Sequence, residues 1–327
     1  MKIKATLDRI PGGMMVVPLL LGACINTLAP NALRIGGFTE ALFVNSGSAL
    51  IALFLLIAGT QINFKTAGSA VGKGVTLLVF KWVIGAAFGL IAIMFAGSNG
   101  LFLGLAPLAI IAAMTNSNGG LYIALAGQYG KEDDKAAYPF LALSDGPFLT
   151  MVALSVFGAM GFAEGMFSPI SFVAVLLPLA VGIIIGNLDH DMGKWLSNGS
   201  DKLVPFFAFA LGMGINFSSI IKGGLSGILL GVLTVLFTGG IGYLLFKKIG
   251  WNPIVGASEG STAGNAVGTP AAIVAANASF APIAEIATVQ IAASVVTTAI
   301  LLPIFIGFLA KRLEKSGGVA KYNESKA

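Results

Sequence analysis

Long apolar runs separated by short polar stretches dominate this 327-residue chain. About 20 apolar residues suffice for a helix to cross a bilayer. By that measure the pattern predicts ten spans, near residues 12–29, 41–62, 74–96, 101–129, 137–160, 169–188, 203–216, 224–246, 253–279 and 282–310. We therefore expect an all-α integral membrane protein with ten transmembrane helices.

The fourth and ninth apolar runs are interrupted by small and polar residues. The fourth contains Thr115–Gly120, TNSNGG, and the ninth contains Ser261–Pro270, STAGNAVGTP. Backbone groups freed by a helix break are costly in hydrocarbon, so such breaks occur where the backbone lines a protein-enclosed cavity. Two interrupted helices at corresponding places in two halves of a chain indicate the central binding site of a transporter.

The two halves of the chain share sequence anchors in the same order. The matched positions are Pro18 with Pro178, Gly22 with Gly182, the stretch 59–64 with 212–217, Thr115 with Thr262, and Asn118 with Asn265. Five spans per copy is an odd number, so the copies, residues 1–160 and 161–327, must be inverted relative to each other in the membrane. The two interrupted helices would then cross at mid-membrane.

Charge gives the orientation. If both termini are cytoplasmic, all but three of the 19 Lys and Arg residues fall on the cytoplasmic side. The exceptions are Arg34 and Lys222, which fall outside, and Lys81, which is embedded in the third span. This asymmetry follows the positive-inside rule. The net charge of +5 therefore reflects cytoplasmic loops, and no nucleic-acid partner is expected.

Composition excludes several classes of protein. Only 10% of the residues are charged, against about 25% in soluble domains. The single cysteine, Cys24, excludes an internal disulfide and a cysteine-rich metal site. Cys24 also ends an apolar run that resembles a lipoprotein signal, but the recurrence of Pro18 and Gly22 in the second half favours a first transmembrane helix. Motifs for hydrolysis or phosphate binding are missing, so neither an enzyme nor ATP-driven transport is expected.

The crossing of the two interrupted helices predicts the chemistry of the solute. Half-helix N-termini suit an anion, whereas half-helix C-termini and unwound carbonyls suit a cation or a proton. Uncharged donors and acceptors suit hydroxyl groups, so we expect a small, hydroxylated anion. The candidate substrate-binding residues are Thr115, Asn116, Ser117, Asn118, Thr262 and Asn265. The alternative is that these residues only cap the helix breaks.

Embedded acidic residues are candidates for proton or ion coupling, because they are expensive in a membrane. Glu259 directly precedes the second break, Asp145 lies beside a local break in the fifth span, and Glu285 begins the tenth. Each has a structural alternative. Glu259 would be solvated near the cytoplasmic end, Asp145 would accept hydrogen bonds from exposed backbone N–H groups, and Glu285 would be interfacial.

Two further ionisable residues have less specific patterns. Lys81 would pair with an embedded acid or attract the carboxylate of the solute, but the pattern favours snorkelling of its side chain to the cytoplasmic interface. His190 lies in an Asp189-His190-Asp191 stretch between the halves, and we expect a solvated connector there and not a metal site.

At these residues the chain resembles the bacterial 2-keto-3-deoxygluconate permeases. The similar segments are residues 4–15, KATLDRIPGGMM, residues 114–122, MTNSNGGLY, and residues 259–270, EGSTAGNAVGTP. The resemblance runs essentially end to end. It implies import of 2-keto-3-deoxygluconate, a sugar acid from pectin breakdown, by proton symport through the inner membrane.

A more distant resemblance concerns architecture alone. Ten spans with crossing broken helices are similar to bile-acid symporters and sodium/proton antiporters. That similarity implies a core domain built from spans three to five and eight to ten, moving against a panel domain built from spans one, two, six and seven.

Three interpretations of the function are consistent with the sequence. The leading one is a proton symporter that needs no cofactor beyond the coupling ion. A sodium-coupled symporter of another small organic anion is the first alternative, with Glu259 and Asn118 holding the ion. A channel is the second, because inverted repeats also build pores. The sequence does not fix the oligomeric state, and a homo-oligomer stays open.

Overall fold

The computed structural model describes residues 2–7, 13–61, 70–131, 134, 137–144, 146–163, 169–214, 217–315, 318 and 322. Within these ranges the regular secondary structure is helical, apart from one isolated bridge between Phe102 and Leu105. The prediction of an all-α protein is confirmed.

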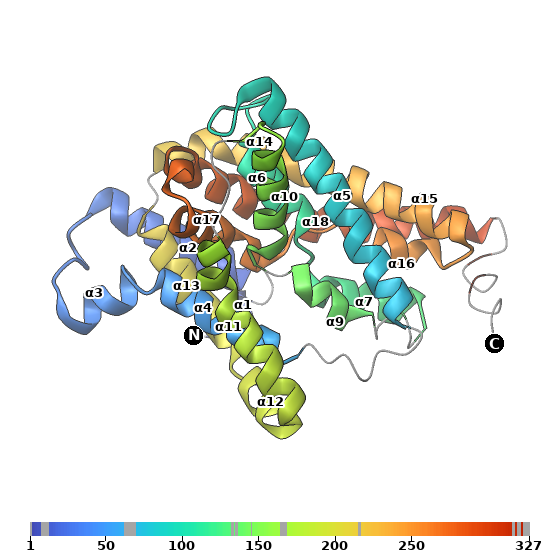
Figure 1. Ribbon diagram of the computed structural model, residues 1–327, viewed down its shortest axis with the longest axis horizontal. Coiled ribbons are helices and arrows are strands. Elements are labelled where there is room, and N and C mark those ends of the chain that lie inside the picture. The colour runs from blue at the N-terminus through green and yellow to red at the C-terminus, as the bar shows by residue number, and fades with distance from the viewer. Residues whose placement is uncertain are drawn as a thin grey trace.

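The helices are labelled in chain order in Figure 1. They are α1 (Ile3–Leu7), α2 (Gly13–Leu28), α3 (Gly37–Phe43), α4 (Gly47–Gly59), α5 (Ala70–Ala96), α6 (Pro107–Thr115), α7 (Gly119–Tyr129), α9 (Tyr138–Leu141), α10 (Phe148–Ala159), α11 (Pro169–Leu188), α12 (His190–Ser197), α13 (Ser200–Gly212), α14 (Phe217–Thr234), α15 (Gly240–Ile249), α16 (Pro253–Ala257), α17 (Thr269–Ala276) and α18 (Ala281–Glu314). A π-helical turn, Val235–Gly239, joins α14 to α15.

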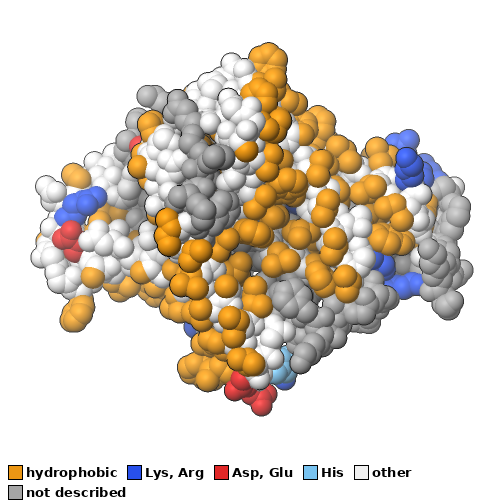
Figure 2. Space-filling model, viewed as in Figure 1, with side chains coloured by type: hydrophobic (Ala, Val, Ile, Leu, Met, Phe, Trp, Pro, Cys, Tyr) orange, Lys and Arg blue, Asp and Glu red, His pale blue; other side chains and the backbone are white. Residues whose placement is uncertain are grey.

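Several of these helices are apolar enough to cross a membrane. Val71–Ala96, Gly223–Ile249 and Ala278–Glu314 are long enough alone, and two bent pairs add up to two more spans. Figure 2 shows that hydrophobic side chains also cover much of the outer surface, as contact with lipid requires. The chain is thus a multi-pass membrane protein, while the count of ten spans stays a prediction.

The two bent pairs include one that the sequence predicted and one that it did not. Pro107–Thr115 and Gly119–Tyr129 meet at 41°, at the predicted break in the fourth span. Gly37–Phe43 and Gly47–Gly59 meet at 58°, within a run predicted to be one continuous helix. The reason is local, because the Ser46 hydroxyl donates to the Leu42 carbonyl and so competes with the backbone hydrogen bonds of a continuous helix.

Helix α6 is the centre of the structure. All nine of its residues are buried, and it packs against α5, α10, α14 and α18. A helix that is apolar all round can face either protein or lipid, and the burial of every residue shows that α6 is surrounded by protein. Because this buried helix ends at Thr115, the first predicted break lies in the middle of the molecule.

A second set of helices, α2, α4, α11 and α13, packs through paired glycines. Gly22 in α2 lies against the backbone of Gly212 in α13, and Gly59 in α4 lies against the backbone of Gly182 in α11. Exchanging the two predicted copies maps one pair onto the other. The other anchor of this part of the repeat, residues 62–64 with 215 and 216, lies outside the described residues.

These close contacts make a stability prediction. We expect Gly59→Leu to lower the stability of the detergent-solubilised protein by about 1–3 kcal/mol, because its Cβ would meet backbone atoms of α11 that cannot move aside. Gly72→Leu in α5 is the matched control, since a Cβ there meets nothing within 4 Å. Thermal unfolding followed by fluorescence measures both, and equal melting temperatures would contradict the packing described.

Candidate binding and coupling site

The first break separates α6 from α7. Asn116 and Asn118 have extended backbone conformations, and the Asn118 side chain accepts a hydrogen bond from the Leu121 N–H at 3.0 Å. Asn is among the best N-cap residues, because its side chain satisfies an N–H group that the helix leaves free. The sequence TNSNGG thus ends one helix and starts the next within three residues.

The second break is longer. Helix α16 ends at Ala257, residues 260–263 have no regular structure, and a 3-10 segment at Gly264–Gly268 leads into α17. Polar side chains hold the unwound stretch, because Thr298 accepts from the Thr262 N–H at 3.0 Å and Ser294 lies 2.8 Å from the Thr262 hydroxyl. Both partners come from α18.

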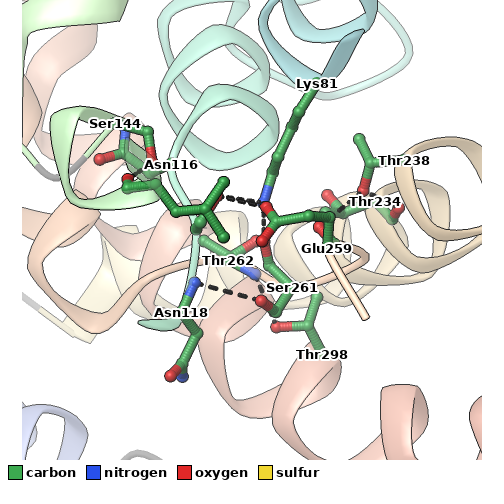
Figure 3. Close-up of polar contacts among 12 residues, drawn as sticks. Lys81, Asn116, Asn118, Ser144, Thr234, Thr238, Glu259, Ser261, Thr262 and Thr298 are labelled. Atoms are coloured by element: carbon green, nitrogen blue, oxygen red, sulfur yellow. Dashed lines mark hydrogen bonds and ion pairs between the residues drawn. The ribbon is translucent and has the colours of Figure 1, made fainter. Parts of the chain in front are cut away.

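The two breaks are in direct contact (Figure 3). The Asn118 N–H donates to the Ser261 hydroxyl at 3.1 Å, and the Ser117 hydroxyl donates to the Glu259 carboxylate. Glu259, Ser117 and Ser261 are all almost completely buried. The alternative in which Glu259 is solvated near the cytoplasmic end is therefore excluded, and its carboxylate belongs to the contact between the breaks.

Lys81 on α5 completes this contact. Its Nζ lies 3.4 Å from Glu259 Oε2 and donates to the Ser117 hydroxyl at 3.2 Å and to the Ser261 carbonyl at 2.7 Å. Lys81 is 1% exposed, so the expectation that it snorkels to the interface is wrong. The physical reason is the close approach of α5 to α6 at Gly85, one turn further on, which turns this face of α5 toward the first break.

Several buried acceptors at the breaks have no protein donor. Among the described residues they are Asn116 Oδ1, Glu259 Oε1, Asn265 Oδ1 and Thr269 Oγ1. Buried polar atoms are paired in the great majority of cases, so each unpaired atom needs an explanation. A ligand rich in hydroxyl groups, or water, would supply the missing donors. The two breaks therefore have the chemistry of a polar binding site.

The segments that contain the two breaks are part of a match to a known protein family. A family model described as 2-keto-3-deoxygluconate permease matches residues 4–315, which include both breaks and Lys81. The chain belongs to this family. A permease is a transporter, so the expectation that the chain is not an enzyme is confirmed.

Individual relatives in this family are similar over nearly the whole chain. The 2-keto-3-deoxygluconate permease 1 of Salmonella typhimurium (strain LT2) is 50% identical over 322 residues, which cover 98% of this chain and 99% of the relative. The 2-keto-3-deoxygluconate permeases of Bacillus subtilis (strain 168) and Pectobacterium carotovorum subsp. carotovorum are 42% and 41% identical, over 96% and 95% of this chain and 96% and 98% of those proteins.

Four of the six predicted substrate-binding residues use their side-chain oxygens in hydrogen bonds within the protein. The Asn118 side chain caps α7, and the Thr115 hydroxyl donates to the Ile111 carbonyl of its own helix. The Thr262 hydroxyl pairs with that of Ser294, and the Ser117 hydroxyl donates to Glu259. Figure 3 shows the Asn118 side chain pointing away from Ser261. Asn116 and Asn265 keep unpaired side-chain oxygens, and these two have the most capacity left for a ligand.

Of the other two predicted coupling residues, the structure places Glu285 alone. Asp145 lies outside the described residues. Glu285 is half-buried near the start of α18, nine residues before Ser294 and so about 13 Å from it along the helix axis. His190 is exposed at the start of α12, as expected of a connector, and the described residues contain no group of three acidic, His or Cys side chains able to hold a metal.

One part of the site had no counterpart in the sequence predictions. The π-helical turn at Val235–Gly239 lies beside Glu259, and the Thr238 hydroxyl is 3.4 Å from the Glu259 carbonyl. Single π-helical turns inside α-helices occur frequently at functional sites. Thr234, Thr238 and the following glycines interrupt an otherwise apolar run, and that pattern was the available signal.

Proposed function

We propose that the chain is a secondary active transporter that imports 2-keto-3-deoxygluconate by proton symport, with alternating access around the contact of the two broken helices. The observation that supports this most is the buried pair of Lys81 and Glu259 between the breaks. The names of the relatives support the choice of substrate, because each is a 2-keto-3-deoxygluconate permease.

The site suits the chemistry of a sugar acid. Such a solute carries one carboxylate and several hydroxyl groups. Lys81 supplies a buried cation for the carboxylate, and the unpaired oxygens of Asn116 and Asn265 accept from hydroxyls. The buried ammonium group of Lys81 must keep a counter-charge, since an unpaired charge in the interior of a protein costs several kcal/mol.

Coupling follows from this requirement for a counter-charge. In the empty transporter the Glu259 carboxylate balances Lys81. When the carboxylate of the solute takes that place beside Lys81, Glu259 becomes an unpaired buried anion unless it binds a proton. One proton per solute molecule then keeps the site neutral in both states. The solute and the proton would cross together, and release of both would restore the ion pair.

The inverted repeat gives a means of alternating access. In our proposal residues 1–160 and 161–327 are inverted copies of five spans each, and the paired contacts Gly22–Gly212 and Gly59–Gly182 support that assignment. The helices α2, α4, α11 and α13 would form the panel domain, against which the rest of the molecule moves. The distribution of Lys and Arg supports an orientation with both termini cytoplasmic, and we propose that the protein lies in the inner membrane.

Uptake of radiolabelled 2-keto-3-deoxygluconate into proteoliposomes tests the proposal. We expect accumulation above the external concentration when an inward proton gradient is imposed, and none with an inward sodium gradient alone. Accumulation that requires sodium would contradict proton coupling and would indicate that the unpaired oxygens of Asn116 and Asn265 bind a sodium ion. Equilibration without accumulation under either gradient would indicate a channel.

Asn265 provides a specific prediction about the solute. We expect Asn265→Ala to raise KM by about 2- to 10-fold with little change in the maximal rate, because one hydrogen bond to a solute hydroxyl is lost. Asn118→Ala should raise KM and also lower the maximal rate, since Asn118 caps α7. Asn198→Ala, at an exposed position after α12, is the control. Unchanged uptake kinetics in both variants at normal expression would exclude these residues from the site.

A further inference from the structure

A pocket at one end of the molecule has a basic lining that the proposed transport cycle does not use. It has a volume of about 300 Å³ and lies between α15 and the C-terminal part of α18. Its lining consists of Gly240, Tyr243, Leu244, Lys247, Leu309 and Arg312. Lys and Arg side chains gather at this end of the molecule, where α15 and the C-terminus lie (Figures 1 and 2).

An apolar groove adjoins this pocket along the same two helices. The groove has a volume of about 360 Å³ and is lined by the π-helical turn and α18, through residues that include Leu236, Ile304 and Phe308. These three side chains are 50%, 64% and 60% exposed, so the groove is open to the surroundings of the protein. Leu236 and Lys247 lie in one continuous helical segment, because the π-helical turn joins α14 to α15.

The dimensions of this combined surface match one leaflet of a bilayer. Leu236 and Lys247 are about 16 Å apart along the helix axis, and half of a bilayer's hydrocarbon core is about 15 Å. Lys247 lies in the last turn of α15, and Arg312 lies in the last turn of α18, so both cations are at the ends of apolar spans. Tyr243 has the polar aromatic ring that is enriched at membrane–water interfaces.

The charges near the pocket are predominantly positive. The last turns of α15 and α18 carry Lys247, Lys248, Lys311 and Arg312, and the cap residue Lys315 follows, while Glu314 is the one acidic residue in these turns. The guanidinium group of an Arg binds phosphate in a bidentate manner, and the ammonium group of a Lys adds a point charge. Basic pockets between transmembrane helices are known sites for anionic lipid head groups.

We infer that this surface binds an acidic phospholipid, with its phosphate between Lys247 and Arg312 and one acyl chain in the groove that contains Leu236, Ile304 and Phe308. A soluble phosphate would need the basic pocket only, whereas a lipid needs the groove as well. The two follow each other along α18 and along the segment formed by the π-helical turn and α15, and this favours the lipid. This inference is independent of the substrate and the coupling ion.

Titration of the purified, delipidated protein in detergent tests it, with the melting temperature as the readout. Cardiolipin is the probe, phosphatidylcholine is the neutral lipid control, and glycerol 3-phosphate is the soluble phosphate control. We expect a saturable rise in melting temperature with cardiolipin alone. In Lys247→Gln/Arg312→Gln the apparent affinity should fall about 25-fold, since each basic residue near an anionic lipid contributes about 5-fold.

Two further variants separate the pocket from general charge. Lys194→Gln/Lys202→Gln removes two exposed basic residues from another part of the molecule and should bind cardiolipin as the unmodified protein does. Ile304→Trp fills the groove and should weaken cardiolipin binding while both cations stay in place. Unchanged binding in Lys247→Gln/Arg312→Gln, or an equal response to phosphatidylcholine, would overturn the inference. An equal response to glycerol 3-phosphate would replace the lipid by a soluble phosphate.

Discussion

Glu259→Gln is expected to abolish accumulation of 2-keto-3-deoxygluconate while preserving its exchange across the membrane. The amide keeps the size of the carboxylate but cannot carry a negative charge, so Lys81 keeps its counter-charge only when the solute is bound. The loaded transporter can then change conformation, and the empty one cannot. Net uptake driven by a proton gradient should fall by about 100-fold, the effect of about 3 kcal/mol for an unpaired buried charge.

The measurement is a comparison of two assays on the same proteoliposomes. Gradient-driven uptake reports accumulation, and counterflow with unlabelled solute inside reports exchange. Glu314→Gln at the exposed end of α18 serves as the control and should perform both reactions. Loss of exchange together with accumulation would show that Glu259 holds the solute or the fold and is not the proton carrier. Full accumulation would exclude Glu259 from coupling altogether.

Lys81→Met should have the second large effect, a fall in both uptake and exchange by about 100- to 4,000-fold. Removing one partner of a buried ion pair costs about 3–5 kcal/mol, and here the removed partner is also the proposed receptor for the carboxylate of the solute. Lys81→Arg would not be a conservative substitution, because the planar guanidinium group differs in shape from the compact ammonium group that donates to Ser117 and Ser261.

The double variant Lys81→Met/Glu259→Gln separates folding from transport. Without either charge the contact between the breaks is neutral, so the melting temperature should rise above that of Lys81→Met toward that of the unmodified protein. Transport should stay absent, because the cation for the solute is missing. If the double variant transports 2-keto-3-deoxygluconate at the normal rate, Lys81 is a structural residue.

Helix breaks depend on the residues of a single chain segment, and the sequence therefore predicted them. Six small and polar residues in an apolar run cannot form a continuous lipid-facing helix, and the structure has a 41° bend there. The second break was predicted in the same way, from Ser261–Pro270. Glu259 was singled out because it directly precedes that break.

The sequence offered Lys81 as a partner for an embedded acid but favoured snorkelling, because the choice between the two depends on which helices pack together. In the sequence Lys81 is a lysine about a third of the way into an apolar span, and a flexible four-carbon stem usually allows such a residue to reach the interface. Its burial results from the approach of α5 to α6 at Gly85, a contact between segments that are apart in the chain. The same limit applies to Thr238, whose contact with Glu259 depends on packing of the π-helical turn against the second break.

The division between capping and ligand-binding residues also required coordinates. Asn116, Asn118 and Asn265 are the same residue type and cannot be told apart in the sequence. Only their hydrogen bonds distinguish them, because the side-chain oxygen of Asn118 caps α7, while those of Asn116 and Asn265 have no partner. The unpredicted bend between α3 and α4 shows that weak polar signals such as Asn45-Ser46 also break apolar runs.

The most direct test of charge-balanced coupling is a count of the protons that cross with each solute molecule. Proteoliposomes with a pH-sensitive dye inside and labelled 2-keto-3-deoxygluconate outside give both fluxes at once, with the membrane potential clamped at zero by potassium and valinomycin. We predict one proton per molecule and no response of the initial rate to an imposed potential, because the loaded and empty sites are both neutral. Uptake without acidification of the interior, or a rate that follows the potential, would contradict the pairing of Lys81 with Glu259 as the coupling device.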